Sequence, residues 1–210
     1  MNILVTPIRI LAVDDHAILR EGLRALIDIE PDMSLVAQAS NGQEALAQFR
    51  SHRPEVTLMD IQMPILDGIE AITAIRAEFP NARIIVLTTF AGDVLAQRAL
   101  KAGASAYVLK GLMRKDLPET IRAVHRGMKY IQSEVAAQIA DHIGEASLSP
   151  REIEVILLVA AGNSNRRIGA KLSINEDTVK GHMTNIMLKL GASDRTHAVT
   201  LAVRRGIIQL

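Results

Sequence analysis

From residue 8 to about residue 126, short apolar runs alternate with amphipathic helical stretches, and this alternation constrains the fold more than any other feature. Short apolar runs bounded by polar residues predict buried strands, while apolar residues at three- and four-residue spacing predict helices. Five β-α units in succession are typical of a parallel sheet covered by helices on both faces. The strands are expected at 8–13, 35–39, 56–60, 84–88 and 106–110, and the helices near 17–29, 42–52, 68–79, 93–102 and 115–127.

The pattern changes after this region. Residues 129–147 contain one helical segment, around 134–142, and are expected to form a partly helical linker. From residue 148 the strand pattern disappears, and helices are expected near 150–161, 166–172, 176–190 and 194–205. The chain is therefore predicted to comprise a doubly wound, flavodoxin-like α/β domain with a five-stranded parallel sheet at 1–128, the linker, and a small all-α four-helix domain at 148–210.

Composition narrows the function classes. The chain has no cysteine, which argues against a disulfide framework and a zinc site, and a cytoplasmic location is expected. No segment approaches the roughly 18 apolar residues of a membrane helix, so no membrane partner is expected. Residues 147–210 carry nine lysines and arginines against five acidic residues, whereas residues 1–128 are nearly balanced. This asymmetry suits a small DNA-binding module attached to a regulatory domain.

Polar groups follow four of the predicted strands. Asp14 and Asp15 come directly after the first strand and Asp60 closes the third, while Thr88 and Lys110 end the fourth and fifth. The carboxyl ends of neighbouring parallel strands meet at one edge, so these groups are expected to converge there. Clustered carboxylates require a cation, and hard oxygen ligands suit Mg²⁺. Taken singly, each aspartate would be read as a loop or helix-capping residue, but the coincidence at one edge favours a phosphoryl-binding site.

These positions fall in motifs that are highly specific together. Residues 13–16 read VDDH, residues 58–64 read LMDIQMP and are followed by Asp67-Gly68, residues 86–89 read VLTT, and residues 106–110 read AYVLK. From about residue 8 to residue 127 the chain resembles the receiver domain of response regulators. The resemblance implies that Asp60 accepts a phosphoryl group from a sensor histidine kinase. It also implies that Mg²⁺ is held by Asp15, Asp60 and the backbone carbonyl of Gln62, with Asp14 acting through water.

The same resemblance also implies which residues respond to phosphorylation of Asp60 and so act as a switch. Lys110 and Thr88 would bind phosphoryl oxygens, and movement of the Thr88 hydroxyl would free space into which Tyr107 rotates. The physical account agrees, because a phosphorylated aspartate carries more charge and more acceptor oxygens than a carboxylate, so nearby donors must rearrange. One departure stands out: receivers commonly have proline after the lysine, whereas Gly111 follows here. The surface beside Lys110 is therefore expected to differ from that of common receivers.

The third helix of the C-terminal domain carries a second pattern. Asn175 is a predicted N-cap followed by two acidic residues, and an apolar stripe of Val179, Met183, Ile186 and Leu190 leaves a polar face outward. Ser164 is expected to cap the preceding helix, and residues 173–175 form a short turn between the two helices, as in a helix-turn-helix. A solvated helical face would give the same pattern, so this segment is weak evidence by itself.

The wider segment is more specific. LSPRE at 148–152, AGNSN at 161–165, TVKGH at 178–182, KLGA at 189–192 and RTHAV at 195–199 resemble the LuxR-type domain of the NarL/FixJ regulators. The resemblance implies that residues 176–190 are a recognition helix for double-stranded DNA and that residues 195–205 form a dimerisation helix. Gly169 also lies inside a predicted helix, where glycine is unfavourable, so close packing is expected there and close approach to DNA at Gly181. The predicted DNA contacts are Thr178, Lys180, Gly181, His182, Thr184 and Lys189.

Together these features predict a non-enzymatic transcription regulator in which phosphorylation of Asp60 controls homodimerisation and sequence-specific DNA binding. Two alternatives stay open. A Mg²⁺-dependent phosphatase would use Asp60 as nucleophile, but Gln62 stands where a second carboxylate would serve as general acid. Alternatively, the chain binds DNA and its first domain is a dimerisation module that does not depend on phosphate. That alternative would leave the complete acidic set of Asp14, Asp15 and Asp60 without a role.

Overall fold

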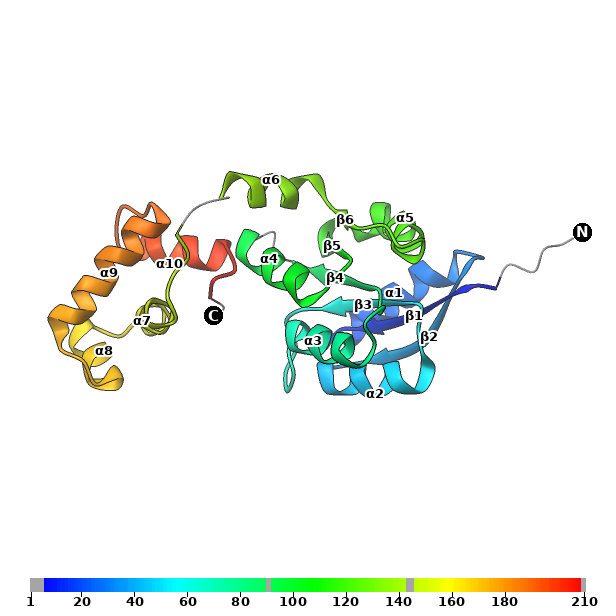
Figure 1. The fold of residues 1–210 in the computed structure, drawn as a ribbon, viewed down its shortest axis with the longest axis horizontal. Coiled ribbons are helices and arrows are strands. Elements are labelled where there is room, and N and C mark those ends of the chain that lie inside the picture. Colours follow the sequence, from blue (N-terminus) through cyan, green and yellow to red (C-terminus); the bar gives the residue numbers. More distant parts are fainter. Residues whose placement is uncertain (1–5, 90–91, 143–145, 209–210) are drawn as a thin grey trace, which may run out of the picture. The chain divides into compact units, whose positions relative to one another are not determined.

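The computed structural model describes residues 6–89, 92–142 and 146–208. The chain divides into two compact units: one combines residues up to Thr89 with Ala96–Ala136, and the other combines a short stretch ending at Leu95 with the chain from Ala137 onward. Figure 1 shows the α/β elements of the first unit and the helices of the second. The predicted fold class, a parallel α/β domain followed by a helical helix-turn-helix domain, is confirmed.

The first unit is built on a parallel sheet with the strand order β2-β1-β3-β4-β5-β6. The strands are β1 (Ile8–Val13), β2 (Met33–Ala39), β3 (Val56–Asp60), β4 (Ile84–Thr88), β5 (Ala106–Leu109) and β6 (Tyr130–Ile131). Strand β1 pairs with both β2 and β3, so β2 is added on one side of β1 and the later strands on the other, and the strand order reverses between β1 and β3. This is the switch point at which α/β sheets bind ligands.

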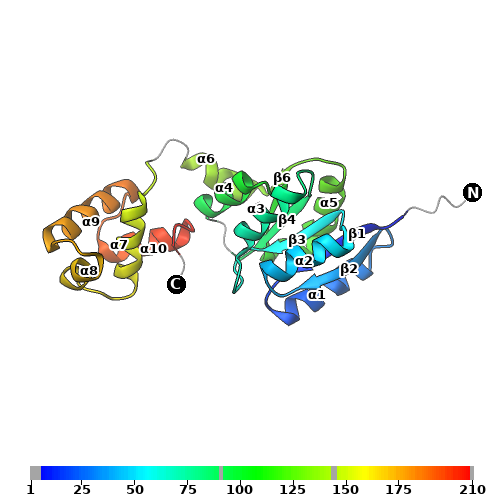
Figure 2. The same ribbon diagram turned by 60° about the horizontal axis from the view of Figure 1, so that its bottom comes forward.

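Helices cover both faces of this sheet (Figure 2). Alternate strand residues such as Ile10 and Leu58 pack with α1 (Ala17–Asp28) and α5 (Met113–His125) into one apolar core. The other face is covered by α2 (Gly42–His52), α3 (Gly68–Glu78) and α4 (Asp93–Ala102), which bury small or branched residues such as Ala45 and Ile72. Strands buried on both faces explain why they read as continuous apolar runs.

Two details differ from the expected elements. The sheet has a sixth strand, because β6 pairs in parallel with Ala106 and Tyr107 of β5, in a region expected to be linker. Strand β5 ends at Leu109, and Lys110 opens a 3-10 turn, η1 (Lys110–Leu112), that runs directly into α5. The expected helix near 134–142 is α6 (Ser133–Asp141). Lys110 therefore lies on a turn at the carboxyl edge of the sheet.

The second unit contains α7 (Pro150–Ala160), α8 (Asn165–Leu172), α9 (Glu176–Leu190) and α10 (Arg195–Arg204). Each begins at a side-chain cap, and the caps of α8 and α9 are Ser164 and Asn175, as predicted. The four stripe residues of α9 are all buried in the core of this unit. Among the described residues, none of the helices combines the length and apolar character that a membrane crossing requires.

Candidate functional site

The predicted acidic groups come together at the carboxyl edge of the sheet, which we call the acidic edge. Asp14 follows β1, Asp60 ends β3, and both side chains are almost completely buried. Between them lies the Lys110 ammonium, whose Nζ is 2.7 Å from Asp14 Oδ2 and 2.9 Å from Asp60 Oδ2. The Lys110 side chain is only 10% exposed. The fold thus places two buried carboxylates and one buried cation at the switch point.

Backbone donors complete the coordination of both carboxylates. Asp14 Oδ1 accepts the His16 amide at 2.9 Å, and Asp60 Oδ1 accepts the Ile61 amide at 2.8 Å. The amide of Gln62 lies farther from the same Asp60 oxygen, at 3.4 Å. The loops after β1 and β3 therefore hold each carboxylate in a fixed orientation.

The charges at this edge perturb one another. Burial raises the pKa of Asp60, Lys110 opposes this effect, and the nearby Asp14 carboxylate adds to it. Burial lowers the pKa of Lys110, but the hydrogen bonds that it donates to Asp14 and Asp60 outweigh burial and hold its pKa above the ordinary value. Asp15, which lies beside Asp14, adds a third carboxylate near the single Lys110 ammonium. The excess negative charge favours a further cation.

The donor set fits a hard divalent cation. Ligand atoms of Asp14, Asp15 and His16 lie within 4.8 Å of one another. Asp15 is about one-third exposed, and its Oδ1 is 2.7 Å from His16 Nδ1, so this imidazole is a partner that the sequence prediction did not assign. Carboxylate oxygens with access to water suit Mg²⁺.

Thr88 and Tyr107 occupy the interior beside this edge. Both are buried, and the Tyr107 hydroxyl is hydrogen-bonded to the Thr88 side chain. Burial raises the pKa of Tyr107 above its ordinary value. The ring already points inward in this structure, so the two predicted switch residues are in direct contact.

The predicted recognition helix presents a continuous outer face. Lys180, Gly181 and Thr184 are exposed, and the face continues to two residues that sequence reasoning missed, Asn185 and Leu188. Leu188 is 80% exposed and adds a large apolar side chain to this face. His182 is half-buried at the margin of this face.

The polar residues of α9 differ in their partners. Lys180 Nζ lies 2.9 Å from Asp177 on the same exposed face, and the Thr178 hydroxyl donates to the capping Asn175 at 2.7 Å. Lys189 instead pairs with Glu152 of α7 at 2.7 Å, and Glu152 is only 4% exposed. A contact between Lys189 and DNA phosphate would have to compete with this ion pair.

The two glycines inside helices of the second unit have opposite surroundings. A Cβ atom on Gly169 would lie 2.7 Å from the Ile174 carbonyl oxygen, so this glycine permits close packing at the turn of the helix-turn-helix. A Cβ atom on Gly181 would meet nothing within 4 Å. Packing within the unit therefore explains Gly169 and does not explain Gly181.

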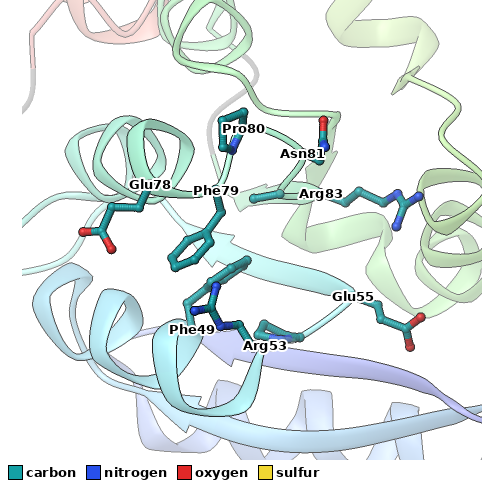
Figure 3. Close-up of a pocket in the computed structure, with 10 residues that line it drawn as sticks. Phe49, Arg53, Glu55, Glu78, Phe79, Pro80, Asn81 and Arg83 are labelled. Carbon is teal, nitrogen blue, oxygen red and sulfur yellow. The ribbon is translucent and has the colours of Figure 1, made fainter.

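A separate pocket of about 400 Å³ lies at the opposite, amino edge of β3 and β4 (Figure 3). Phe49 and Phe79 stack with ring centroids 4.9 Å apart, and the Arg53 guanidinium lies 4.2 Å from the Phe79 centroid. Glu78 is paired with Arg50, and Glu55 accepts the Arg9 amide. These contacts join the ends of α2 and α3, far along the strands from the acidic edge.

Two family descriptions match this chain. Residues 10–122 match "Response regulator receiver domain", and residues 146–202 match "Bacterial regulatory proteins, luxR family". The first match spans every element that supplies the acidic edge. The second spans the helix-turn-helix formed by α8 and α9.

Whole-chain comparisons agree. The transcriptional regulatory protein LiaR of Bacillus subtilis (strain 168) is 39% identical over 209 residues, covering 96% of this chain and 99% of LiaR. The response regulator protein VraR of Staphylococcus aureus (strain NCTC 8325 / PS 47) is 35% identical over 207 residues, with 96% and 99% covered. RcsB of Salmonella enterica serovar Typhimurium, solved bound to promoter P1flhDC with the phosphomimetic BeF3-, is similar with a TM-score of 0.73 at 26% identity, covering 93% of this chain and 98% of RcsB.

Proposed function

Because this chain belongs to the two-component response regulators with a LuxR-type DNA-binding domain, and so regulates transcription, we propose that phosphorylation of Asp60 controls its binding to DNA. The observation that carries the proposal is the position of Lys110 between Asp60 and Asp14 at the switch point of the sheet. The proposed phosphodonor is a phosphohistidine on a sensor kinase.

In the proposed reaction, an Asp60 carboxylate oxygen attacks phosphorus, the P–N bond to the kinase histidine breaks, and the histidine nitrogen keeps the electron pair. Lys110 is held at the distance at which it can neutralise the new charge, and the Thr88 hydroxyl is the neighbouring donor from β4. Mg²⁺, held by Asp15, Asp60 and the Gln62 carbonyl with Asp14 acting through water, would supply further charge neutralisation when bound.

The proposed response involves Tyr107. Once Thr88 is drawn toward a phosphoryl oxygen, its hydrogen bond with Tyr107 must be remade or lost, and a buried hydroxyl without a partner is costly. The inward Tyr107 ring is thereby coupled to the charge on Asp60. This coupling changes the packing of the helices that cover β4 and β5.

For the second unit, we propose that α9 enters the major groove with Lys180, Gly181 and Thr184 toward base edges. Open space around Gly181 supports this orientation, because glycine weakens a helix and no packing within the protein requires it. Thr178, His182 and Lys189 are proposed at the margins, where phosphates run. Asn185 and Leu188 extend the same face.

We further propose that the phosphorylated protein is a cytoplasmic homodimer, with α10 as the dimerisation helix. Paired half-sites on DNA match a two-fold symmetric protein. Lasting turnover of added phosphomonoesters is not expected, since Gln62 provides no general acid beside Asp60.

The test is DNA affinity and oligomeric state, at fixed salt, of the wild type and Asp60→Ala with and without acetyl phosphate and Mg²⁺. We expect the donor to raise affinity and dimer fraction in the wild type and to change neither in Asp60→Ala. Equal DNA binding by both proteins with and without donor would leave the DNA-binding function and overturn phosphorylation control. Turnover of p-nitrophenyl phosphate would favour the phosphatase instead.

A further inference from the structure

A buried glutamine just after β6 joins the two elements on either side of Lys110. Gln132 is 3% exposed, and its Oε1 accepts the backbone amide of Leu109, the last residue of β5, at 2.9 Å. Its Nε2 donates to Asp116 Oδ2, in the first turn of α5, at 3.1 Å. Both ends of this carboxamide are therefore engaged.

The Gln132 side chain extends the pairing of a very short strand. Strand β6 pairs with β5 only as far as Tyr107, opposite Ile131. The amide of Leu109, two residues farther along β5, is bonded by the Gln132 side chain where a longer strand would offer a carbonyl. A partly buried amide that loses its partner costs roughly 1–3 kcal/mol, so this contact constrains the end of β5.

The constrained segment carries Lys110. Leu109 and Asp116 bracket the turn η1, and nothing lies within 4 Å of the place where a Gly111 side chain would begin. Glycine does not restrict this turn as proline would. Gln132 thus fixes both ends of an otherwise permissive turn that positions the ammonium facing Asp60.

The residue after Gln132 opens α6, the helix through which the chain continues toward the second unit. We propose that Gln132 is a positioning residue that transmits displacement of Lys110 to α6 when Asp60 is phosphorylated. A new phosphoryl group draws the Lys110 ammonium toward it, which shifts η1 and the end of β5. The buried carboxamide follows because staying in place would break a buried hydrogen bond. The inference rests on the proposed function of Asp60.

The test uses three variants. Gln132→Leu removes both hydrogen bonds at similar volume, and Gln132→Glu keeps an acceptor for Leu109 but places a carboxylate against Asp116. The double variant Gln132→Glu/Asp116→Asn restores a donor–acceptor pair with the roles exchanged. Gln43→Leu, at an exposed position of α2, is the matched control.

Each protein is treated with acetyl phosphate and Mg²⁺, phosphorylation is quantified by intact mass, and DNA affinity is measured before and after. We expect both single variants to be phosphorylated and to bind DNA like the wild type without donor. Their gain in affinity on phosphorylation should be smaller by about tenfold, or ~1.4 kcal/mol of coupling. The double variant should recover most of the gain, which a loss of general stability would not allow.

Full phosphorylation together with a full gain in Gln132→Leu would overturn the inference and leave the proposed function intact. A double variant no better than Gln132→Glu would also overturn it, because the geometry of the pair would then be irrelevant. Absence of phosphate on Asp60 in the wild type would instead refute the proposed function, and this inference with it.

Discussion

The carboxyl edge of the sheet and the outer face of α9 use charged and hydroxyl side chains in opposite surroundings. At the edge, Asp14, Asp60 and Lys110 are buried and satisfied by one another. On α9, Lys180 and Thr184 are exposed, and the contacts they make are local ones on the same helix. Buried charges depend strongly on their partners, whereas exposed pairs contribute little to stability.

This contrast separates two ways of building a site. At the edge, the contacts among Asp14, Asp60 and Lys110 form before any ligand arrives, so substitutions there should disturb the folded protein as well as its chemistry. The outer face of α9, which we propose binds DNA, is not completed by contacts with other described parts of the protein, so substitutions there should change binding and leave folding alone. Variants at the two sites should therefore differ in how far they change stability and how far they change binding.

The largest effect is expected for Lys110→Met. The variant leaves two buried carboxylates without their cation, which should destabilise the first unit by about 3–5 kcal/mol in metal-free buffer. Mg²⁺, which we propose binds the folded acidic edge, should restore part of this loss. The measurement is urea unfolding with and without Mg²⁺, monitored by tyrosine fluorescence. This probe reports on the first unit because Tyr107 and Tyr130 are the two tyrosines and the chain has no tryptophan.

Lys101→Met, at an exposed position of α4, is the matched control and should leave the unfolding midpoint unchanged. Wild-type stability in metal-free Lys110→Met would contradict the interdependence of the buried charges.

A pair of lysines on α9 gives the next effect. Lys189→Ala leaves Glu152 buried without its partner and should destabilise the second unit by roughly 2–4 kcal/mol. Lys180→Ala should change stability by less than about 0.5 kcal/mol but lower affinity for a specific DNA site by about 1–3 kcal/mol. Urea unfolding followed by the NMR signals of His182 and His197, together with DNA titration at fixed salt, distinguishes the two. The reverse pattern would show that Lys189 contributes more to DNA binding than to the stability of the second unit.

The sequence predicted most of what local patterns and strand ends determine. Apolar runs located the five longer strands. The rule that the carboxyl ends of parallel strands share an edge predicted that Asp14, Asp60 and Lys110 lie close together. Capping residues Ser164 and Asn175 marked the starts of α8 and α9 correctly. These features depend on short stretches of chain or on a topology with few solutions.

Contacts between distant residues were not predictable in this way. Strand β6 has only two residues, too few for a periodicity, and Gln132 acts through the Leu109 amide 23 residues away. In the sequence, Glu152 is notable only as part of the motif at 148–152. Its ion pair with Lys189 joins two helices through residues that are 37 positions apart. The positions of such polar side chains follow from packing, which a single sequence does not display.

The two glycines inside helices of the second unit should give smaller and opposite effects. Gly169→Ala forces a Cβ atom against the Ile174 carbonyl oxygen, so the second unit should lose about 1–3 kcal/mol despite the better helix propensity. Gly181→Ala meets open space and should gain up to about 1 kcal/mol. If α9 approaches DNA at Gly181, the same methyl group should weaken specific binding. Thermal unfolding and DNA titration of both variants provide the test, and unchanged DNA affinity in Gly181→Ala would remove the proposed close approach.

The smallest effect is a pH dependence of the Glu152–Lys189 pair. Burial raises the pKa of Glu152, but hydrogen bonds from Lys189 and Ser149 outweigh it and hold the pKa below its ordinary value of 4.5. A carboxyl whose folded pKa is depressed stabilises the protein above its unfolded pKa and loses this contribution as pH falls through the folded value. The stability difference between wild type and Glu152→Gln, about 1 kcal/mol at neutral pH, should therefore narrow as the pH falls below 4.5 and through the folded pKa. The measurement is the urea midpoint of the second unit as a function of pH, monitored by the NMR signals of His182 and His197. A stability difference that stays constant with pH would mean that Glu152 acts through its cap geometry rather than its charge.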